Sequence, residues 1–364
     1  MAEYNSKIKE LEDRISNTKY NKKTQMAIGQ YKAQLAKLKE KETTRGSGTS
    51  GGGGCEVRKT GDGTIILIGF PSAGKSTLLN KLTEAKSEVG AYAFTTLTCI
   101  PGVMTYKHAK IQILDVPGIV KGAASGRGRG REVLASMRSA DVCLILLDAT
   151  RPKEYNVIVK EIYDTHIRIN QRKPDVKIVK TAKDGVRMGS TVRLSHLDEP
   201  TVKAVLKEFR INNADVVIRS DITVDQFIDC IEANKKYMPA ITIVNKSDLV
   251  TPTELKRIMK KYKADLAISA VKNINIAELK ELIYNKLDLI SIYLKEPTKV
   301  ADLEEPLIVF RNFTVGDVCK KLHKDFVDKF KFSRVWGKSA KFDGQKKMLK
   351  HKLIDGDVLE LHLR

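Results

Sequence analysis

Residues 69–77, GFPSAGKST, have the spacing of a loop that binds the phosphates of a nucleotide. They meet the pattern G-x-x-x-x-G-K-[ST] at every fixed position: Gly69, Gly74, Lys75 and Ser76. Backbone N–H groups of such a loop, and the dipole of the helix that follows, attract negative charge. We expect Lys75 to reach the β- and γ-phosphates and the Ser76 hydroxyl to ligate Mg²⁺. A plain strand-to-helix turn would account for the glycines but not for the Lys-Ser pair.

A second motif, Asp115-Val116-Pro117-Gly118, follows an apolar run and lies on the carboxyl side of the loop. A carboxylate at a strand end can hold Mg²⁺ through water, and the Gly118 N–H can meet the γ-phosphate without a side chain in the way. Alone, D-x-P-G is an ordinary turn. In this order after the phosphate loop, it indicates a nucleoside triphosphate site.

The base is predicted by Asn245, Lys246 and Asp248, which follow another apolar run. A carboxylate at Asp248 can accept hydrogen bonds from the N1–H and exocyclic amine of guanine, and adenine has no matching donors. The stem of Lys246 can pack on the base, and Asn245 can brace the loops. Ser269 and Ala270, after a further short strand, would present a backbone N–H to guanine O6. These fragments in this order predict guanine.

Between these motifs, Phe94-Thr95-Thr96-Leu97 offers hydroxyl groups near the expected triphosphate. A threonine here can supply a second Mg²⁺ ligand that is ordered only when a γ-phosphate is present, which would make it a switch. Thr95 and Thr96 are both candidates, and the residue types alone do not select one.

The motifs must be positioned by the strands and helices around them. In this part of the chain apolar runs alternate with helical patterns, which predicts a parallel sheet in an α/β fold. The expected strands are residues 65–68, 111–114, 142–147, 241–244 and 266–268. The interval 148–240 is far longer than the dozen or so residues that a crossover needs. Its own pattern has strands expected at 176–180, 191–194 and 214–219 and helices at 199–209 and 223–234. We therefore expect a small α+β subdomain inserted into the nucleotide-binding domain.

Both ends of the chain add further segments. Apolar residues spaced three and four apart in 1–45 predict a helical hairpin with a turn at 17–21, and Thr24 is the expected cap of its second helix. This basic hairpin could be a coiled-coil contact or a basic arm. A Gly-rich linker follows at 46–60. Beyond 289, strands expected at 307–310, 334–337 and 359–363 and a helix at 314–325 predict a β-grasp-type module.

The composition limits the classes of function. With 364 residues, 42% of them apolar, the chain can build two or three domains with proper cores. The absence of a long apolar run and the charged first residues predict a protein with neither a membrane span nor a signal peptide. The cysteines form no C-x-x-C pair, which fits a cytosolic protein with free thiols and suggests no metal site: Cys55, Cys99, Cys143, Cys230 and Cys319. The net charge of +21 favours a polyanion partner such as nucleic acid.

Two stretches concentrate the positive charge. Residues 320–352 hold many Lys and Arg around Trp336, which suits RNA through phosphate contacts and stacking. A solvated face is the alternative, and Trp336 taken alone is better explained as a core residue. Arg127, Arg129 and Arg131 stand among glycines, so we expect a flexible basic loop for RNA or a partner rather than arginine fingers.

The motifs together resemble one family of GTPases. Residues 69–77, 94–98, 115–119 and 122–131 are similar to the Obg-related GTPases, and within these to the developmentally regulated GTP-binding proteins. Residues 213–216, 219–221 and 314–319 share this likeness, which covers nearly the whole chain.

The resemblance implies Mg²⁺-dependent hydrolysis of GTP, with Thr96 as the threonine that ligates Mg²⁺ beside Ser76. It implies an OBG-type GTPase domain at 61–289, interrupted by the inserted subdomain at 163–238, between a helix-turn-helix-like region at 1–45 and a TGS domain at 290–364. It also implies a ribosome-associated role in cytoplasmic translation, with ribosomal RNA and a dedicated regulatory protein as partners. We expect a monomer or a heterodimer with that regulator, docking of the hairpin and the tail on ribosomal RNA, and neither DNA nor a membrane as a partner.

The predicted site residues fall into three groups. Lys75, Thr96 and Gly118 are expected to assist catalysis, and Ser76, Thr96 and, through water, Asp115 to hold Mg²⁺. The residues expected to bind GTP or GDP are Gly69, Phe70, Pro71, Ser72, Ala73, Gly74, Lys75, Ser76, Thr77, Phe94, Thr95, Thr96, Asp115, Val116, Pro117, Gly118, Asn245, Lys246, Asp248, Ser269 and Ala270.

Some positions depart from the common pattern. Ala73 stands where the family that the chain resembles usually has Val, and Lys121 stands where it usually has Glu. Ile119 stands where many GTPases carry a glutamine that orients the attacking water. Because an aliphatic side chain forms no hydrogen bonds, hydrolysis needs help from a monovalent cation such as K⁺, a displaced side chain or a partner, although Ser72 occupies a position where Asn often accompanies K⁺. We expect slow intrinsic hydrolysis, stimulated by a partner or the ribosome. The alternative is a GTP-dependent scaffold that binds RNA or ribosomes and barely hydrolyses GTP.

Overall fold

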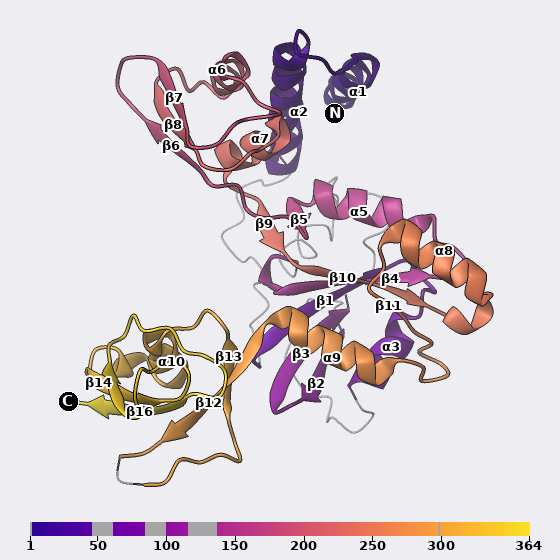
Figure 1. The fold of residues 1–364 in the computed structure, drawn as a ribbon. Coiled ribbons are helices and arrows are strands. Elements are labelled where there is room, and N and C mark those ends of the chain that lie inside the picture. The colour runs from indigo at the N-terminus through magenta and orange to yellow at the C-terminus, as the bar shows by residue number, and fades with distance from the viewer. Residues whose placement is uncertain (1, 46–60, 84–99, 116–136, 298) are drawn as a thin grey trace. The chain divides into compact units, whose positions relative to one another are not determined.

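A computed structural model describes residues 2–45, 61–83, 100–115, 137–297 and 299–364 of the chain (Figure 1). The chain forms two compact units, each described by itself below. The first unit comprises Met1–Cys55, Ile119–Arg138 and Val157–Met238, and the second Glu56–Gly118, Ser139–Asn156 and Pro239–Arg364. Among the described residues, no helix is long and apolar enough to cross a membrane.

The centre of the second unit is a six-stranded sheet in the order β11-β10-β4-β1-β3-β2. Its strands are β1 (Gly63–Gly69), β2 (Ile100–Tyr106), β3 (Ala109–Asp115), β4 (Val142–Asp148), β10 (Ala240–Asn245) and β11 (Leu266–Ala267). All neighbours pair in parallel except β2, which is antiparallel to β3. The α/β fold with its predicted parallel strands is therefore confirmed.

The sheet is apolar on both faces, as expected for a parallel sheet covered on both sides. Every residue of β1 and β4 is buried. Ile65 and Leu67 belong to the core that the helices α3 (Lys75–Leu82) and α9 (Ile276–Leu287) complete. The helix α8 (Pro252–Tyr262) follows the short η1 (Ser247–Leu249). This burial explains why continuous apolar runs identified these strands from the sequence.

The edge strand β2 is not among the predicted strands. Its sequence, IPGVMTY, has a proline and a glycine at its second and third positions, which weaken a strand signal but are tolerated at an edge. A glycine is needed at Gly102 for packing, because a Cβ there would meet side-chain atoms of Leu79 in α3 and of Thr83, which caps the end of that helix. The strand therefore depends on pairing with its antiparallel neighbour β3, which the local sequence of β2 does not predict.

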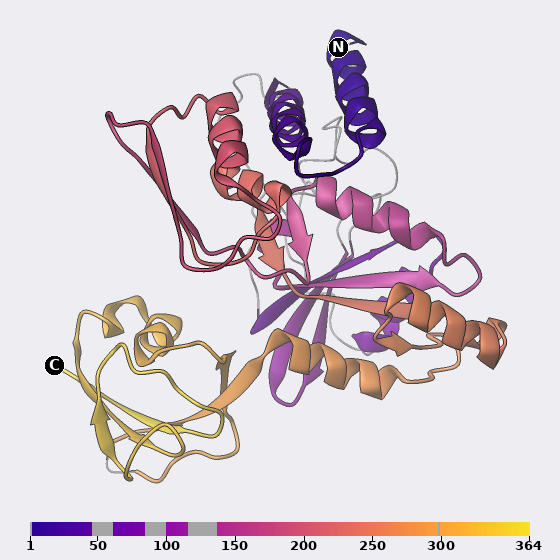
Figure 2. The ribbon, with the colours of Figure 1, turned by 45° about the horizontal axis from the view of Figure 1, so that its top comes forward.

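The first unit contains the N-terminal hairpin of α1 (Ala2–Asn17) and α2 (Gln25–Arg45), packed against the inserted segment. Figure 2 shows α2 running beside the helix α6 (Glu199–Glu208). Ala33 of α2 is fully buried in a core with Val202 and Phe227. Across the same contact, Lys32 Nζ lies 2.6 Å from an Asp225 carboxylate oxygen. The apolar face of α2 is thus covered within the chain.

The inserted segment forms a three-stranded sheet in the order β6-β8-β7, with α6 and α7 (Val224–Glu232) packed on it. Its strands are β6 (Val176–Lys180), β7 (Val186–Ser190) and β8 (Ala214–Ile218). The strand expected at 191–194 is wrong: β7 ends at Ser190, whose hydroxyl donates to the Val192 carbonyl at 2.6 Å in a turn. Both helices are confirmed, and Thr223 caps α7 in a capping box with Gln226.

A short parallel ribbon closes the insertion. The strand β5 (Ile167–Ile169) pairs with β9 (Lys236–Met238). The beginning and the end of the inserted segment therefore lie side by side. Arg168, the middle residue of β5, donates to both carboxylate oxygens of Asp229 at 2.7 and 2.8 Å in a buried ion pair. Three-residue strands such as these have too little pattern to be found from sequence.

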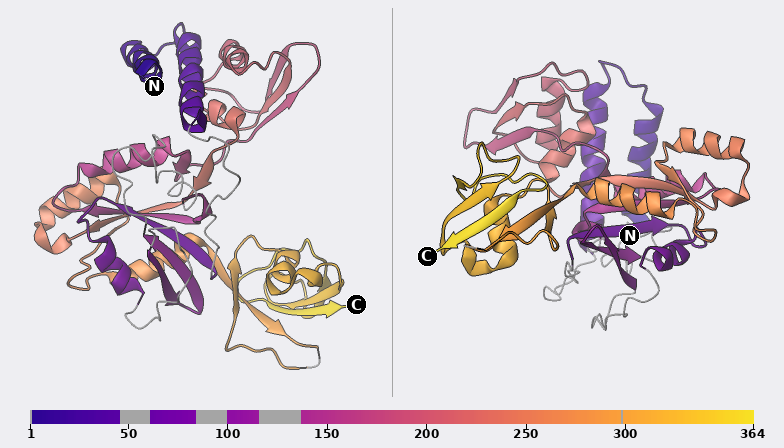
Figure 3. Two further views of the ribbon diagram at one scale, coloured as in Figure 1. Left: turned by 180° about the vertical axis from the view of Figure 1, so that it is seen from behind. Right: turned by 60° about the horizontal axis from the view of Figure 1, so that its bottom comes forward.

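The C-terminal part of the second unit, which ends at the C label in Figure 3, contains a five-stranded sheet. Its strand order is β13-β12-β16-β14-β15. Its elements are β12 (Leu289–Lys295), β13 (Leu307–Phe310), α10 (Val315–Leu322), η2 (Lys324–Phe326), β14 (Phe330–Trp336), β15 (Gln345–Lys347) and β16 (Val358–Leu363). The predicted capping box is present, with Thr314 accepting from the Asp317 N–H at 3.3 Å. The helix ends at Leu322 rather than at 325, and β12 and β15 were not predicted. The predicted core position of Trp336 is not observed, because its ring is half-buried outside the core cluster.

The contact between α2 and α6 generates one prediction. A Cβ on Gly29 would lie 2.8 Å from the Thr201 methyl group, so Gly29→Leu should force α2 away from α6. Overpacking of this kind costs about 1–3 kcal/mol of unfolding free energy. Denaturant unfolding followed by circular dichroism measures it. Met26→Leu, at an exposed position of the same helix, is the control, and equal stability of the two variants would contradict the packing.

Candidate functional site

The carboxyl ends of the parallel strands bring the predicted motifs to one edge of the sheet. There, β1 ends at Gly69, and α3 begins at Lys75 directly after Gly74. A Cβ on Gly69 would lie 2.7 Å from the Leu146 carbonyl oxygen, so the loop needs a glycine at this point. Lys75 Nζ donates to the carbonyl oxygens of Gly69 and Phe70 at 3.1 and 3.2 Å. Strand, loop and helix therefore have the predicted arrangement.

The other residues of the phosphate loop differ in their exposure to solvent. Ala73 is buried under the loop in the core beneath α3, whereas Pro71, Ser72, Ser76 and Thr77 are exposed. The hydroxyl groups of the first turn of α3 therefore face solvent, where a phosphate or a hydrated cation can reach them.

Asn245, at the end of β10, joins the phosphate loop to the next loop of the sheet. Its Nδ2 donates to the Ala73 carbonyl at 2.8 Å, and its Oδ1 accepts from the Ala270 N–H at 3.1 Å. The side chain is only 3% exposed. Gly74 has a positive φ of 96°, and a Cβ there would collide with the same Asn245 amide. The predicted bracing role of Asn245 thus matches two specific hydrogen bonds.

The predicted guanine-reading residues lie together beyond β10 and β11. Asp248 in η1 is near Lys272 Nζ at 3.5 Å. A hydrogen bond with Ser269 holds the pKa of Asp248 below its usual range, so the carboxylate is ionised and able to accept hydrogen bonds. Ser269 and Ala270 are buried, and Ser247 N–H donates to the Ile268 carbonyl at 3.1 Å. This hydrogen bond ties the two loops together.

Asp115 ends β3, the neighbour of β1, and is 5% exposed. Its Oδ1 is buried and has no hydrogen-bond partner among the described residues. Burial raises the pKa of this carboxyl, and the charge of Lys75 partly opposes the rise. An acceptor left without a donor beside a cationic lysine fits a hydrated cation, since Mg²⁺ binds few carboxylates and keeps several waters.

Asp148 is a residue of this site that the sequence analysis missed. It ends β4 in register with Asn245 and is 1% exposed. Its carboxylate accepts from Lys246 Nζ at 2.7 Å and from the Thr150 hydroxyl at 2.6 Å. Burial alone would raise the pKa of Asp148, but these hydrogen bonds outweigh it and the pKa is lowered. The available signal was an aspartate at the carboxyl end of a predicted central strand.

Several predicted residues fall outside the part of the chain that the structure describes. They are Phe94, Thr95, Thr96, Val116, Pro117, Gly118, Ile119, Lys121, Arg127, Arg129 and Arg131. Their roles therefore remain predictions from the sequence.

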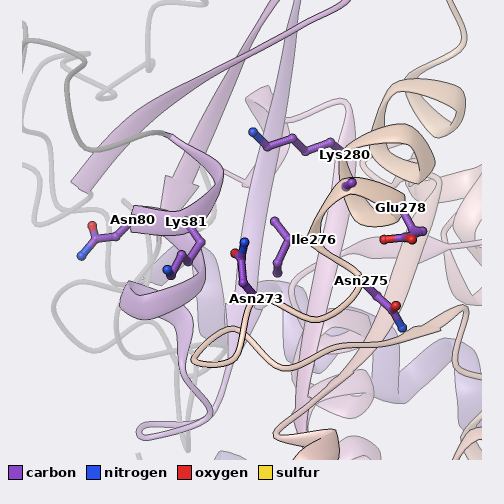
Figure 4. Close-up of a pocket in the computed structure, with 8 residues that line it drawn as sticks. Asn80, Lys81, Asn273, Asn275, Ile276, Glu278 and Lys280 are labelled. Carbon is purple, nitrogen blue, oxygen red and sulfur yellow. The ribbon is translucent and has the colours of Figure 1, made fainter.

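A pocket of about 740 Å³ lies between α3 and the start of α9 (Figure 4). Lys81 lies on the α3 side of this hollow and Asn273 and Ile276 on the other, and Asn80 points away from it. None of the predicted nucleotide-binding residues lines the pocket. It is therefore separate from the edge of the sheet where the motifs meet.

Comparison with known proteins agrees with this geometry. The family described as "50S ribosome-binding GTPase" matches residues 64–181, the C-terminal region of that domain matches 183–289, and the TGS domain matches 290–363. Developmentally-regulated G-protein 3 of Arabidopsis thaliana is 44% identical over 99% of both chains. The chain belongs to the developmentally regulated GTP-binding proteins.

Two further relatives of this GTP-binding protein are similar over nearly their whole length. Ribosome-interacting GTPase 1 of Saccharomyces cerevisiae is 42% identical over 98% of both chains. An uncharacterized GTP-binding protein of Methanocaldococcus jannaschii is 53% identical over 98% of this chain and 92% of its own. The recognition of the family, the P-loop GTPase fold and the TGS domain are thus confirmed for this family member.

The ion pair of Asp148 with Lys246 leads to a prediction for nucleotide affinity. Asp148→Asn removes the charge that orients Lys246, and hydrogen bonds to charged groups contribute about 1.5–3 kcal/mol. We expect GTP and GDP to bind roughly ten- to hundredfold more weakly in titration calorimetry. Asp184→Asn removes the carboxylate of an exposed ion pair with Arg187 and should leave the affinity unchanged.

The same variant should change how stability depends on pH. Because the pKa of Asp148 is lowered by folding, the ionised carboxylate stabilises the fold at neutral pH. This contribution is lost as the pH falls below the usual aspartate value of about 3.9. The difference in unfolding free energy between wild type and Asp148→Asn should therefore shrink in acid. A difference independent of pH would contradict an ionised Asp148.

Proposed function

We propose that this family member is a Mg²⁺-dependent GTPase switch that acts on the ribosome in cytoplasmic translation. The observation that supports it most is the Asn245 side chain, which joins the phosphate loop to the loop with Ser269 and Ala270. In this way Asn245 holds the phosphate loop at a fixed distance from the loop that we expect to bind guanine. The name of the yeast relative, a ribosome-interacting GTPase, supports the ribosomal partner.

The proposed roles of the nucleotide-binding residues follow from the phosphate loop outward. Backbone N–H groups of the loop surround the phosphates, and Lys75 moves from the Gly69 and Phe70 carbonyls to the β- and γ-phosphates. Asp248 accepts from the guanine N1–H and N2–H₂. Lys246, held by Asp148, packs its stem along the base.

For Mg²⁺ we propose ligation by Ser76 and Thr96 and by Asp115 through water. The exposed Ser76 hydroxyl and the unpartnered buried Oδ1 of Asp115 fit this assignment among the described residues. When bound, Mg²⁺ neutralises charge on the β- and γ-phosphates. Gly118 would donate its N–H to the γ-phosphate.

We propose that intrinsic hydrolysis is slow and that the ribosome or a partner stimulates it. Ile119 offers no hydrogen bond to a water molecule, so the attacking water must be oriented by a group from elsewhere. A bound K⁺ ion is one candidate and a group of the ribosome another. Arg127, Arg129 and Arg131 would contact RNA or a partner.

The remaining segments would provide partner surfaces. We propose the division into residues 1–45, 46–60, 61–289 with an insertion at 163–238, and 290–364. Ribosomal RNA and a dedicated regulatory protein are the proposed partners, with the chain acting as a monomer or as a heterodimer with that regulator. The net charge of +21 supports an RNA partner.

The proposal is tested by phosphate release from GTP, with K⁺ or Na⁺, and with or without ribosomes. We expect slow turnover by the protein alone and an increase of at least tenfold with ribosomes. The increase should require Mg²⁺. Fast turnover by the isolated protein in Na⁺ buffer, with no effect of ribosomes, would contradict the proposed switch.

Asp248→Asn is the matched control for this experiment. An asparagine can donate to the C2 carbonyl of xanthine but cannot accept the two guanine N–H groups. Ribosome-stimulated turnover should therefore be lost with GTP and restored with xanthosine triphosphate. Unchanged GTP turnover in this variant would show that the activity comes from another site.

A further inference from the structure

The C-terminal sheet has two different faces. One face packs on α10, with Ile292, Val335 and Leu359 in its core. Alternation along the strands turns the neighbouring side chains to the opposite face. We call this the aromatic face, and its residues are Lys295, Phe332, Arg334, Trp336, Lys346, Glu360 and His362.

The strand register sets the order of charges on the aromatic face. Lys295, Glu360, Arg334 and Lys346 form one row across β12, β16, β14 and β15. Glu360 is 3% exposed and accepts from Lys295 Nζ at 2.8 Å and from His362 Nε2 at 2.6 Å. Its charge is thus balanced inside the row, while Arg334 and Lys346 are exposed. The face presents positive charge to solvent.

Each of two rings on this face is paired with an ammonium group. Lys346 Nζ lies 4.8 Å from the centre of the Phe332 ring, and Lys295 Nζ lies 4.3 Å from that of Trp336. Phe332 also stacks on His362, with ring centres 4.2 Å apart. Both rings are only half-buried. A half-exposed ring beside a cation offers a surface for a base and a charge for its phosphate.

We infer that the aromatic face binds unpaired bases of an RNA strand, with Phe332 and Trp336 as stacking platforms and Lys346 and Arg334 as phosphate contacts. Phe332 and Trp336 are four residues apart on β14, about 13 Å, so one strand can reach both. On binding, a base displaces the lysine that covers the ring, and the freed ammonium group contacts a phosphate. This arrangement combines the two features of single-strand binding, a positive surface and sequence-tolerant stacking.

Single-stranded RNA fits the face better than the other polyanions. A duplex has phosphates but keeps the faces of its bases stacked inside, so the rings would gain no partner. An acidic peptide can pair with the cations but offers no flat ring to cover the two aromatic side chains. The inference rests on the proposed ribosomal function, because it assigns RNA to one face of this chain.

The test uses the intrinsic fluorescence of Trp336, the one tryptophan of the sequence. A short oligouridylate is titrated into the full-length protein, with a duplex of equal charge and polyglutamate as comparison polyanions. Stacking on the indole should quench its emission with the single strand only. Affinity should also fall with rising salt, as phosphate contacts require.

Two substitutions assign the binding to named side chains. Phe332→Leu keeps an apolar group but removes the ring, and it should weaken binding about five- to hundredfold, since stacking contributes that much per base. Lys346→Ala should lower the salt dependence by roughly one phosphate contact, a slope change of about 0.7. Lys320→Ala removes an equal charge from α10, on the opposite face, and should change neither.

Several results would overturn the inference. Equal quenching by the duplex or by polyglutamate, binding without quenching, or equal losses in Lys346→Ala and Lys320→Ala would each show that stacking on this face is absent. Because Phe332 is half-buried, circular dichroism checks the folding of its variant, and the exposed Lys346 keeps the test decisive if that variant unfolds.

The outcome also separates this inference from the proposed function. Ribosome-stimulated GTP turnover that persists in Phe332→Leu and Lys346→Ala, without oligouridylate binding in wild type, rejects only the aromatic face. Oligouridylate binding without any effect of ribosomes on turnover rejects the proposed function and leaves the aromatic face intact.

Discussion

The buried amide of Asn245 joins two loops that come from distant parts of the sequence. Its donor side bonds to Ala73 in the phosphate loop, and its acceptor side bonds to Ala270 beyond β11. Because the side chain is buried, losing either partner would leave an unsatisfied polar group at a cost of about 1–3 kcal/mol. The absence of a side chain at Gly74 makes room for this amide. One side chain therefore fixes the spacing between the phosphate loop and the loop that holds Ser269 and Ala270.

The parallel sheet makes this interaction possible. β1, β3, β4 and β10 all deliver their last residues to the same edge, which places Asp115, Asp148 and Asn245 beside the phosphate loop. Asp148, which is buried, then holds the partly exposed Lys246 through an ion pair of 2.7 Å. The pair fixes the position of the Lys246 ammonium group next to the end of β4.

How much the sequence could predict depends on the range of the interactions. Continuous apolar runs and the spacing of Gly69, Gly74 and Lys75 identified the central strands and the loop, because both are local patterns. The pair of Asp148 and Lys246 joins residues far apart in the sequence, and its register appears only in the folded sheet. The short strands β5 and β9, and the strand end at Ser190, depend likewise on partners elsewhere. The place of Trp336 follows from alternation across β14, not from its size.

We propose that GTP hydrolysis releases the protein from the ribosome. It is tested most directly by measuring the dissociation of the labelled protein from ribosomes, loaded with GTP or with a non-hydrolysable analogue. The account predicts that the GTP-loaded protein leaves after hydrolysis, whereas the protein with the analogue stays bound. Equal dissociation rates with the two nucleotides would contradict the switch and favour a scaffold that needs only bound nucleotide.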